Sequence, residues 1–234
     1  MKPLMRRRVL LGLAVATLAV ACGGGGEATP DPIPADLAAA ESAAESGFDA
    51  GLAGDRAAAT DAGRTTADRW ARYRARGVSD GAPADALIAV DTAIADANRL
   101  AATNATGPQL ARAFNAISAP MGRIYATYKP PVPASLLDLD YLGRELIVDA
   151  RVADLALATT DLDRLVAQWA PFRSAVIAAG GGAQARAMDT GLADARNGIT
   201  ARDAAAVERA GVNATDAVDL IETLYADRAR DPAD

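Results

Sequence analysis

Apolar side chains recur at steps of three and four residues over long stretches of this chain. In the C-terminal half they are Val148, Val152, Leu155, Leu162, Val166, Trp169 and Val176. This spacing places apolar side chains on one face of a helix, whereas strands would show alternation at every second residue. Alanine is abundant and aromatic residues make up only 4% of the chain, which favours helices packed through small side chains. The pattern predicts an all-α protein.

Two stretches interrupt the helical pattern and divide the chain. Residues 23–35 read GGGGEATPDPIPA, and residues 129–133 read KPPVP. Glycine makes a linker flexible, and prolines placed like these do not fit inside a helix. We therefore predict a linker over 22–35, a first helical repeat over 36–128, a connector over 129–135 and a second helical repeat over 136–234.

The two halves resemble each other in sequence. DTAIADA at residues 91–97 matches DTGLADA at residues 189–195, and Trp70 and Arg74 match Trp169 and Arg173. Later matches follow at an offset that drifts only from 99 to 97. They pair Leu110, Arg112, Ala113, Met121, Ile124 and Tyr128 with Val207, Arg209, Ala210, Val218, Ile221 and Tyr225. Paired tryptophans in register predict an internal duplication.

Each half is predicted to form one long helix and a returning helix with a break. The first break lies at residues 104–108, where Thr106 and Gln109 have the spacing of a capping box. The second lies near Asn197-Gly198, with a restart at Thr200 and Asp203 as its capping partner. Four arms of roughly 40 to 47 residues would each be about 60–70 Å long. They predict an up-down-up-down bundle of two αα-hairpins. The alternative is two separate three-helix units joined at Pro130.

The N-terminus has the features of an export signal. Lys2, Arg6, Arg7 and Arg8 precede an uncharged apolar run over residues 9–21. A run of thirteen residues is shorter than the ~20 that a membrane-spanning helix needs. Residues 1–21 are therefore predicted to be a signal peptide. Arg6-Arg7 also fits a twin-arginine signal, although an ordinary basic segment explains it as well.

The apolar run ends in Leu18-Ala19-Val20-Ala21-Cys22, followed by four glycines. This segment resembles the bacterial lipoprotein signal over roughly the first 26 residues. The resemblance implies cleavage before Cys22 and acylation of its thiol, which would anchor the protein to a membrane. That family prefers leucine where this chain has Ala19. Ala19-Val20-Ala21 also fits ordinary secretion without a lipid. Gly23, which follows the cysteine, favours an outer-membrane or surface address.

Composition excludes several classes of function. Removing residues 1–21 takes away four of the 24 bases and none of the 30 acids, and so acidic a protein is a poor partner for nucleic acid. The chain has no histidine and one cysteine. This excludes histidine-based catalysis and haem ligation, as well as intrachain disulfides and cysteine-rich zinc sites. Exported helical-bundle cytochromes and imelysin-like proteins use histidines that this chain lacks, so we predict no cofactor and no metal.

Three groups of residues are candidate sites, each with a structural alternative. Arg69, Arg72 and Arg76, beside Trp70 and Tyr73, could bind an anion, or could complement a helix C-terminus and cover the core rim. Trp70, Trp169 and Tyr128 could line a cavity for an apolar ligand, or could be core anchors. The third group is expected to form ion pairs that fix the register of the hairpins. It pairs the acids of the repeat, Asp91, Asp96, Asp189 and Asp194, with Arg74, Arg173, Arg112 and Arg209.

The repeated acids Asp91, Asp96, Asp189 and Asp194 could instead form a carboxylate site for a hard cation such as calcium. Two Asp-Leu-Asp motifs could also bind a metal. Asp138-Leu-Asp140 lies near an expected helix start, where acids are favoured. Asp161-Leu-Asp163 lies inside an expected helix, where a solvated face is the simpler interpretation.

The sequence thus predicts a lipid-anchored, extracytoplasmic helical module that binds or scaffolds an unidentified protein or small molecule. One alternative is a carrier that seats a lipid or porphyrin between the hairpins. A less favoured alternative is an enzyme that uses carboxylates and tyrosine, because no serine lies in a nucleophile motif.

Overall fold

The computed structural model describes residues 33–230, and all regular structure within them is helical. The predicted all-α class is confirmed. The helices are α1 (Ala35–Ala53), α2 (Arg56–Ser79), α3 (Ala84–Ala101), α4 (Gly107–Ser118), α5 (Met121–Tyr125), a 3₁₀ turn (Ala126–Tyr128), α6 (Ser135–Arg151), α7 (Leu155–Ala178), α8 (Gly182–Thr200) and α9 (Ala204–Arg230). The predicted signal peptide, Cys22 and most of the predicted linker lie outside the described residues.

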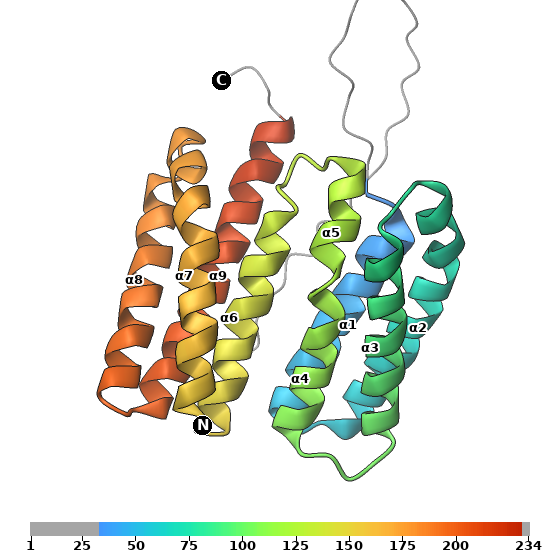
Figure 1. Cartoon of the computed structure of the whole chain (residues 1–234), viewed down its shortest axis with the longest axis horizontal. Helices are drawn as coiled ribbons and strands as arrows, with labels where there is room; N and C mark the ends of the chain where they lie inside the picture. The colour runs from blue at the N-terminus through green and yellow to red at the C-terminus, as the bar shows by residue number, and fades with distance from the viewer. Residues whose placement is uncertain (1–32, 231–234) are drawn as a thin grey trace, which may run out of the picture.

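The helices form two four-helix bundles that stand side by side (Figure 1). In the first bundle α1 packs on α2 and α4, and α3 packs on the same two helices. In the second bundle α6 packs on α7 and α9, and α8 packs on the same two helices. The structure therefore differs from both arrangements considered from the sequence. Each half is a complete four-helix bundle, so the chain forms neither one bundle of four long arms nor a pair of three-helix units.

The difference arises because the first arm of each half folds back on itself. Gly54 ends α1 in the left-handed conformation, with φ 72°, and Asp55 then caps α2 by accepting a hydrogen bond from the Ala58 N–H (3.0 Å). The second half uses Ala153 at φ 58° and the N-cap Asp154. Val152, expected on the buried face of one continuous helix, is exposed at this turn.

The breaks in the second arms lie close to the predicted positions. Thr106 and Gln109 form the expected capping box at the start of α4. In the second half α8 continues through Asn197-Gly198 to Thr200. The cap of α9 is Asp203, which accepts a hydrogen bond from the Ala206 N–H (2.9 Å), in place of the predicted Thr200.

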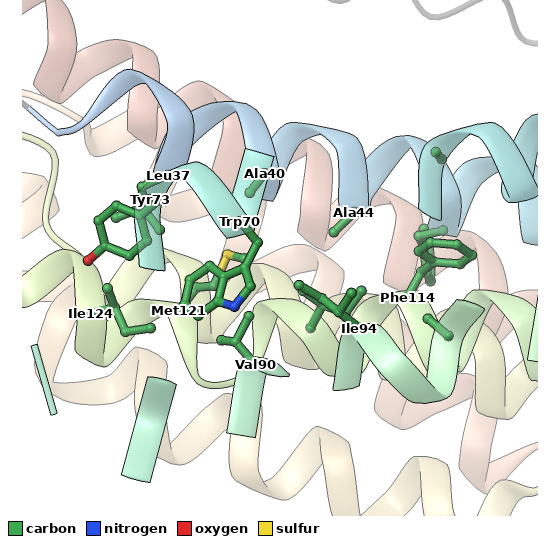
Figure 2. Packing of buried hydrophobic residues seen from close by; sticks show 14 of the residues in the cluster. Leu37, Ala40, Ala44, Trp70, Tyr73, Val90, Ile94, Phe114, Met121 and Ile124 are labelled. Carbon is green, nitrogen blue, oxygen red and sulfur yellow. The ribbon is translucent and has the colours of Figure 1, made fainter. Parts of the chain in front are cut away.

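Each bundle has its own apolar core. In the first, Leu37, Trp70, Val90, Phe114 and Met121 meet between the helices (Figure 2). The second core gathers other leucines together with Trp169 and Met188. Small residues allow the close packing: a Cβ added at Gly51 of α1 would lie 2.5 Å from the backbone nitrogen of Ala111 in α4. This contact requires glycine, because no real side chain tolerates that distance.

Matching elements occupy matching places in the two halves. Helices α2 and α7 both have 24 residues, and both their first and their last residues are 99 positions apart. Helix α9 takes the place of α4 and α5, which are separated near Pro120. These correspondences support the internal repeat.

Helix α6 joins the two bundles. It belongs to the second bundle, and it also packs against α4 and α5 of the first. Leu146 faces the second core, whereas Val148 packs in the first. Figure 1 shows α6 between α4 and α7 (in yellow-green). A helix with neighbours on two sides has few positions that face solvent, so its polar residues are forced inside.

Candidate functional site

Helix α6 carries four charged side chains in the interior of the protein. Asp140, Arg144, Glu145 and Asp149 are all buried. Asp140 and Arg144 lie four residues apart and therefore on the same side of the helix, as do the two acids Glu145 and Asp149. A buried charge is costly unless it is paired and hydrogen-bonded. Partners from both bundles meet these four residues, which makes α6 the candidate functional site.

The first group of partners surrounds Arg144. Its guanidinium donates to Glu45 of α1 and to Asp140 of α6, and it stands 5.7 Å from the centre of the Phe48 ring. Glu41 and Glu222 lie close enough to interact electrostatically with Arg144. We call this group the Arg144 cluster; its members are Glu41, Glu45, Asp140, Arg144 and Glu222.

Two carboxyl groups of the Arg144 cluster have raised pKa values. Burial, followed by repulsion from Asp140 and Glu45, raises the pKa of Glu222 to about 8. Burial, followed by repulsion from Glu45, raises the pKa of Glu41 well above its usual value. One oxygen of Glu41 is buried without a hydrogen-bond partner. The cluster therefore holds protons more tightly in the folded protein than in the unfolded chain.

We expect the substitution Glu222→Gln to stabilise the protein at alkaline pH. The pKa of Glu222 is raised from 4.5 to about 8 on folding. Glu222 therefore makes its full contribution to stability below about pH 4.5, and this contribution falls as the pH rises toward 8, by up to ~1.4 kcal/mol per pH unit. Glutamine does not ionise, so the gain in melting temperature over wild type should be large at about pH 8.5 and small at about pH 5. Thermal unfolding followed by circular dichroism measures it.

Asp227→Asn is the matched control for this experiment. Asp227 lies on the same helix and is exposed, so its substitution should change the melting temperature little at either pH. A gain in E222Q that is the same at both pH values would contradict the assignment.

The second group of buried charges contains three acids. We call it the carboxylate cluster; its members are Glu145 and Asp149 of α6 and Asp161 of α7. One carboxylate oxygen of each residue lies within 4.8 Å of the other two, and all three residues are buried. Asp161 was expected on a solvated face as part of an Asp-Leu-Asp motif. It lies inside instead, and only Asp163 is exposed, where it pairs with Arg196 (2.8 Å).

Helix α4 of the first bundle supplies two partners to this cluster. Arg112 donates to Asp149, and its Nε lies 3.2 Å from a carboxylate oxygen of Glu145. The amide of Asn115 donates to the other oxygen of Glu145 (2.7 Å) and to the carbonyl of Tyr141 (3.0 Å). The carboxylate cluster thus lies where the two bundles meet.

The electrostatics of the cluster centre on Asp149. Burial raises its pKa to about 7; Arg112 opposes this shift, whereas Asp161 and Glu145 add to it by repulsion. Arg164 contacts one oxygen of Asp161 (3.0 Å) from the solvent side. Three acids so close together can hold a shared proton or a cation.

Sequence reasoning missed Asn115, Glu145 and Asp149. A signal was present: leucine, isoleucine and valine occupy more than one face of residues 136–148. Apolar residues on more than one face indicate a helix with neighbours on more than one side, so the charges that lie between these residues are candidates for burial.

Trp70 and Trp169, candidates for lining a ligand cavity or for anchoring a core, are core anchors. Trp70 donates its indole N–H to Asp91 (2.6 Å), and Trp169 donates to Asp189 (2.8 Å). Both rings are buried, each in a different core. The predicted ion pairs of the same motif are present: Arg74 lies 3.0 Å from Asp91, and Arg173 lies 2.8 Å from Asp189. The repeated acids therefore join the second and third helices of each bundle.

Two other predicted ion pairs have different outcomes. Arg112 pairs with Asp149 and Glu145 rather than with Asp96, because α4 turns this residue toward α6. Asp96 pairs instead with Arg99 of its own helix (3.2 Å). Arg209 is exposed, and within residues 33–230 it forms no ion pair. The repeat thus keeps one of the two expected ion pairs in both halves.

The predicted anion site is not assembled as expected. Arg69 pairs with Asp36 (3.1 Å) and Arg76 with Asp80 (3.0 Å), so acids already neutralise two of the three arginines. Arg72 is exposed. Tyr73 is buried, and its hydroxyl lies 3.1 Å from that of Tyr128, which in turn donates to Asp80 (2.8 Å). These contacts favour the structural interpretation.

The described surface also has two open grooves. One lies between α8 and α9 and includes Arg186, Thr190, Asp216 and the exposed Leu220. The other lies near the turn between these helices and includes Arg209. Neither is lined by Trp70, Trp169 or Tyr128.

Comparison with known proteins adds no relative. The chain matches no protein family, no curated protein and no solved structure. Between residues 33 and 230, no helix has both the length and the hydropathy to cross a bilayer. Functional inference therefore depends on this chain's own residues.

Proposed function

We propose that the protein is a lipid-anchored binding or scaffolding module outside the cytoplasm. Anchoring is inferred from Cys22, placed between an apolar run and a glycine linker. The structural observation that carries the proposal is the filled pair of bundles joined through α6. Buried ion pairs from Glu45 and Arg112 of the first bundle end on this helix. Such a junction supports a rigid body that presents surfaces rather than one that opens around a ligand.

The core aromatic residues favour this proposal over an apolar-ligand carrier. A carrier would need Trp70, Trp169 and Tyr128 to line one cavity between the halves. Trp70 and Tyr128 pack in the first core and Trp169 in the second. Burial of these side chains in two separate cores therefore supports a packing role over a shared ligand cavity.

Surface charge indicates the type of partner. Acids outnumber bases in the chain, and the groove between α8 and α9 combines Asp216 and Arg186 with the exposed Leu220. A mixed surface of this type suits a protein with basic and apolar side chains, or a small cationic ligand.

The anchoring proposal is tested by expressing the full chain and its Cys22→Ser variant in a bacterial host. We expect the wild type in the membrane fraction, with an N-terminal peptide that carries acyl chains by mass spectrometry. The variant should lose the lipid and leave the membrane fraction. Ala19→Leu is the matched control, because it moves the segment toward the preferred lipoprotein signal and should keep the lipid.

Two results would contradict the proposal. One is a wild-type mature protein in the soluble fraction with an unmodified thiol on Cys22. The other concerns binding: if nothing is reproducibly enriched when the anchored protein is purified from its native membrane, with C22S as the control, the binding role fails.

A further inference from the structure

We propose that the carboxylate cluster binds one hard divalent cation, of the size of Ca²⁺, in a site that both bundles complete. Glu145 and Asp149 of α6 and Asp161 of α7 supply the ligand oxygens. Asn115 and Arg112 of α4, in the first bundle, close the site. The ligand oxygens thus all come from the second bundle, and the first bundle covers the site.

The kind of ligand favours calcium over magnesium. The cluster offers three carboxylate oxygens that all lie within 4.8 Å of one another. Ca²⁺ takes protein oxygens in a flexible geometry, with carboxylates that bind through one or both oxygens. Mg²⁺ demands near-octahedral geometry, keeps several waters and is held by one or two carboxylates. A buried set of three carboxylates therefore suits Ca²⁺ better than Mg²⁺.

An unpartnered buried oxygen points to a missing ligand. The Asp149 side chain is 0% exposed, and its Oδ2 has no hydrogen-bond partner. The Oδ1 of Asn115, also fully buried, has none either. Buried acceptors are nearly always satisfied in proteins, so each exception needs an explanation. A cation beside Asp149 would supply one for that oxygen, as would a proton shared with Asp161, and the Ca²⁺ titration below distinguishes the two.

The arginines leave room for a cation. Arg112 contacts one oxygen each of Asp149 and Glu145, and Arg164 contacts one oxygen of Asp161. The Arg164 side chain is 59% exposed and can move into water. With Arg164 released, the three carboxylates are balanced by Arg112 together with one divalent cation. Cation binding thus requires Arg164 to move away, while Arg112 keeps its contacts with Asp149 and Glu145.

Calorimetric titration of the full chain tests the proposal. The protein is purified in a mild detergent, stripped with a chelator and titrated at about pH 8 with CaCl₂ and, separately, with MgCl₂. We expect one saturable Ca²⁺ site per chain and Mg²⁺ binding at least about tenfold weaker. Asp161→Asn should weaken Ca²⁺ binding at least about tenfold. Arg164→Gln should tighten it several-fold, because it removes the competing positive charge.

Asp163→Asn is the matched control. Asp163 lies two residues from Asp161, is exposed and pairs with Arg196, so D163N should bind Ca²⁺ within about twofold of wild type. Circular dichroism establishes that each variant is folded. If D161N does not fold, Glu145→Gln and R164Q decide the question.

Three outcomes overturn the proposal. The first is wild-type protein that gives neither saturable heat nor a rise in melting temperature with Ca²⁺ at millimolar concentration. The second is equal weakening by D161N and D163N, which would mark diffuse attraction to an acidic surface. The third is Mg²⁺ binding tighter than Ca²⁺.

Discussion

Replacing Arg144 with methionine is expected to lower the free energy of unfolding by about 3–5 kcal/mol near pH 8. The guanidinium is buried and satisfies Glu45 and Asp140 at once. Methionine fills much of the same volume but leaves these carboxylates buried without their cation. Urea unfolding followed by circular dichroism measures the loss. At about pH 5 the loss should be smaller, because protons can then neutralise members of the Arg144 cluster.

Arg196→Met provides the control for this prediction. Arg196 pairs with Asp163 at 2.8 Å, and both side chains are more than half exposed. Exposed ion pairs contribute about 0–1 kcal/mol, so this variant should unfold almost as the wild type does. A near-neutral R144M at both pH values would show that α6 does not depend on its buried charge to join the bundles.

The substitution Trp169→Ala is expected to cost about 3–5 kcal/mol of unfolding free energy. Its indole is buried in the second core, so alanine leaves a cavity there and removes the N–H that donates to Asp189. Trp169→Phe keeps most of the apolar contact and loses the hydrogen bond, so it should cost about 1 kcal/mol beyond the small change in volume. Chemical unfolding of the two variants side by side separates packing from hydrogen bonding.

This prediction also bears on the choice between a scaffold and a carrier. If W169A unfolds with a loss below about 1 kcal/mol, the tryptophan does not pack tightly and the core has space for a ligand. The carrier alternative would then regain support. Trp70→Ala in the first bundle should behave like W169A, because Trp70 has the same contact with Asp91.

Several features of the structure follow from local sequence patterns. The helical class follows from three- and four-residue spacing, and the capping box of Thr106 and Gln109 follows from short-range hydrogen bonds. The contacts of Arg74 with Asp91 and of Arg173 with Asp189 could be predicted because the motif occurs twice in the same register.

Other features depended on contacts that no local pattern specifies. The turn after α6 contains neither glycine nor proline, and it places Ala153 at φ 58°. Helical periodicity continues across it, so the sequence there resembles one long helix. The packing of α7 against α6 and α8 selects the turn over a continuous helix. Asp154 caps α7 as Asp55 caps α2, but only the first turn also has a glycine, Gly54, at the position of positive φ. The sequence therefore contains a recognisable stop at Gly54-Asp55, and the prediction of one long arm there is wrong.

The amino-acid sequence by itself determined the helical class, the capping box of Thr106 and Gln109, and the repeated tryptophan motif with its ion pairs. Only the tertiary structure decided that each half closes into its own bundle and that α6 is shared between them. Whether Asp149 or Asp161 is solvated depends on which other helices cover it, and those helices come from distant parts of the chain. Burial, and with it the chemistry of a carboxylate, is therefore a property of the assembled fold and not of the residue's own helix.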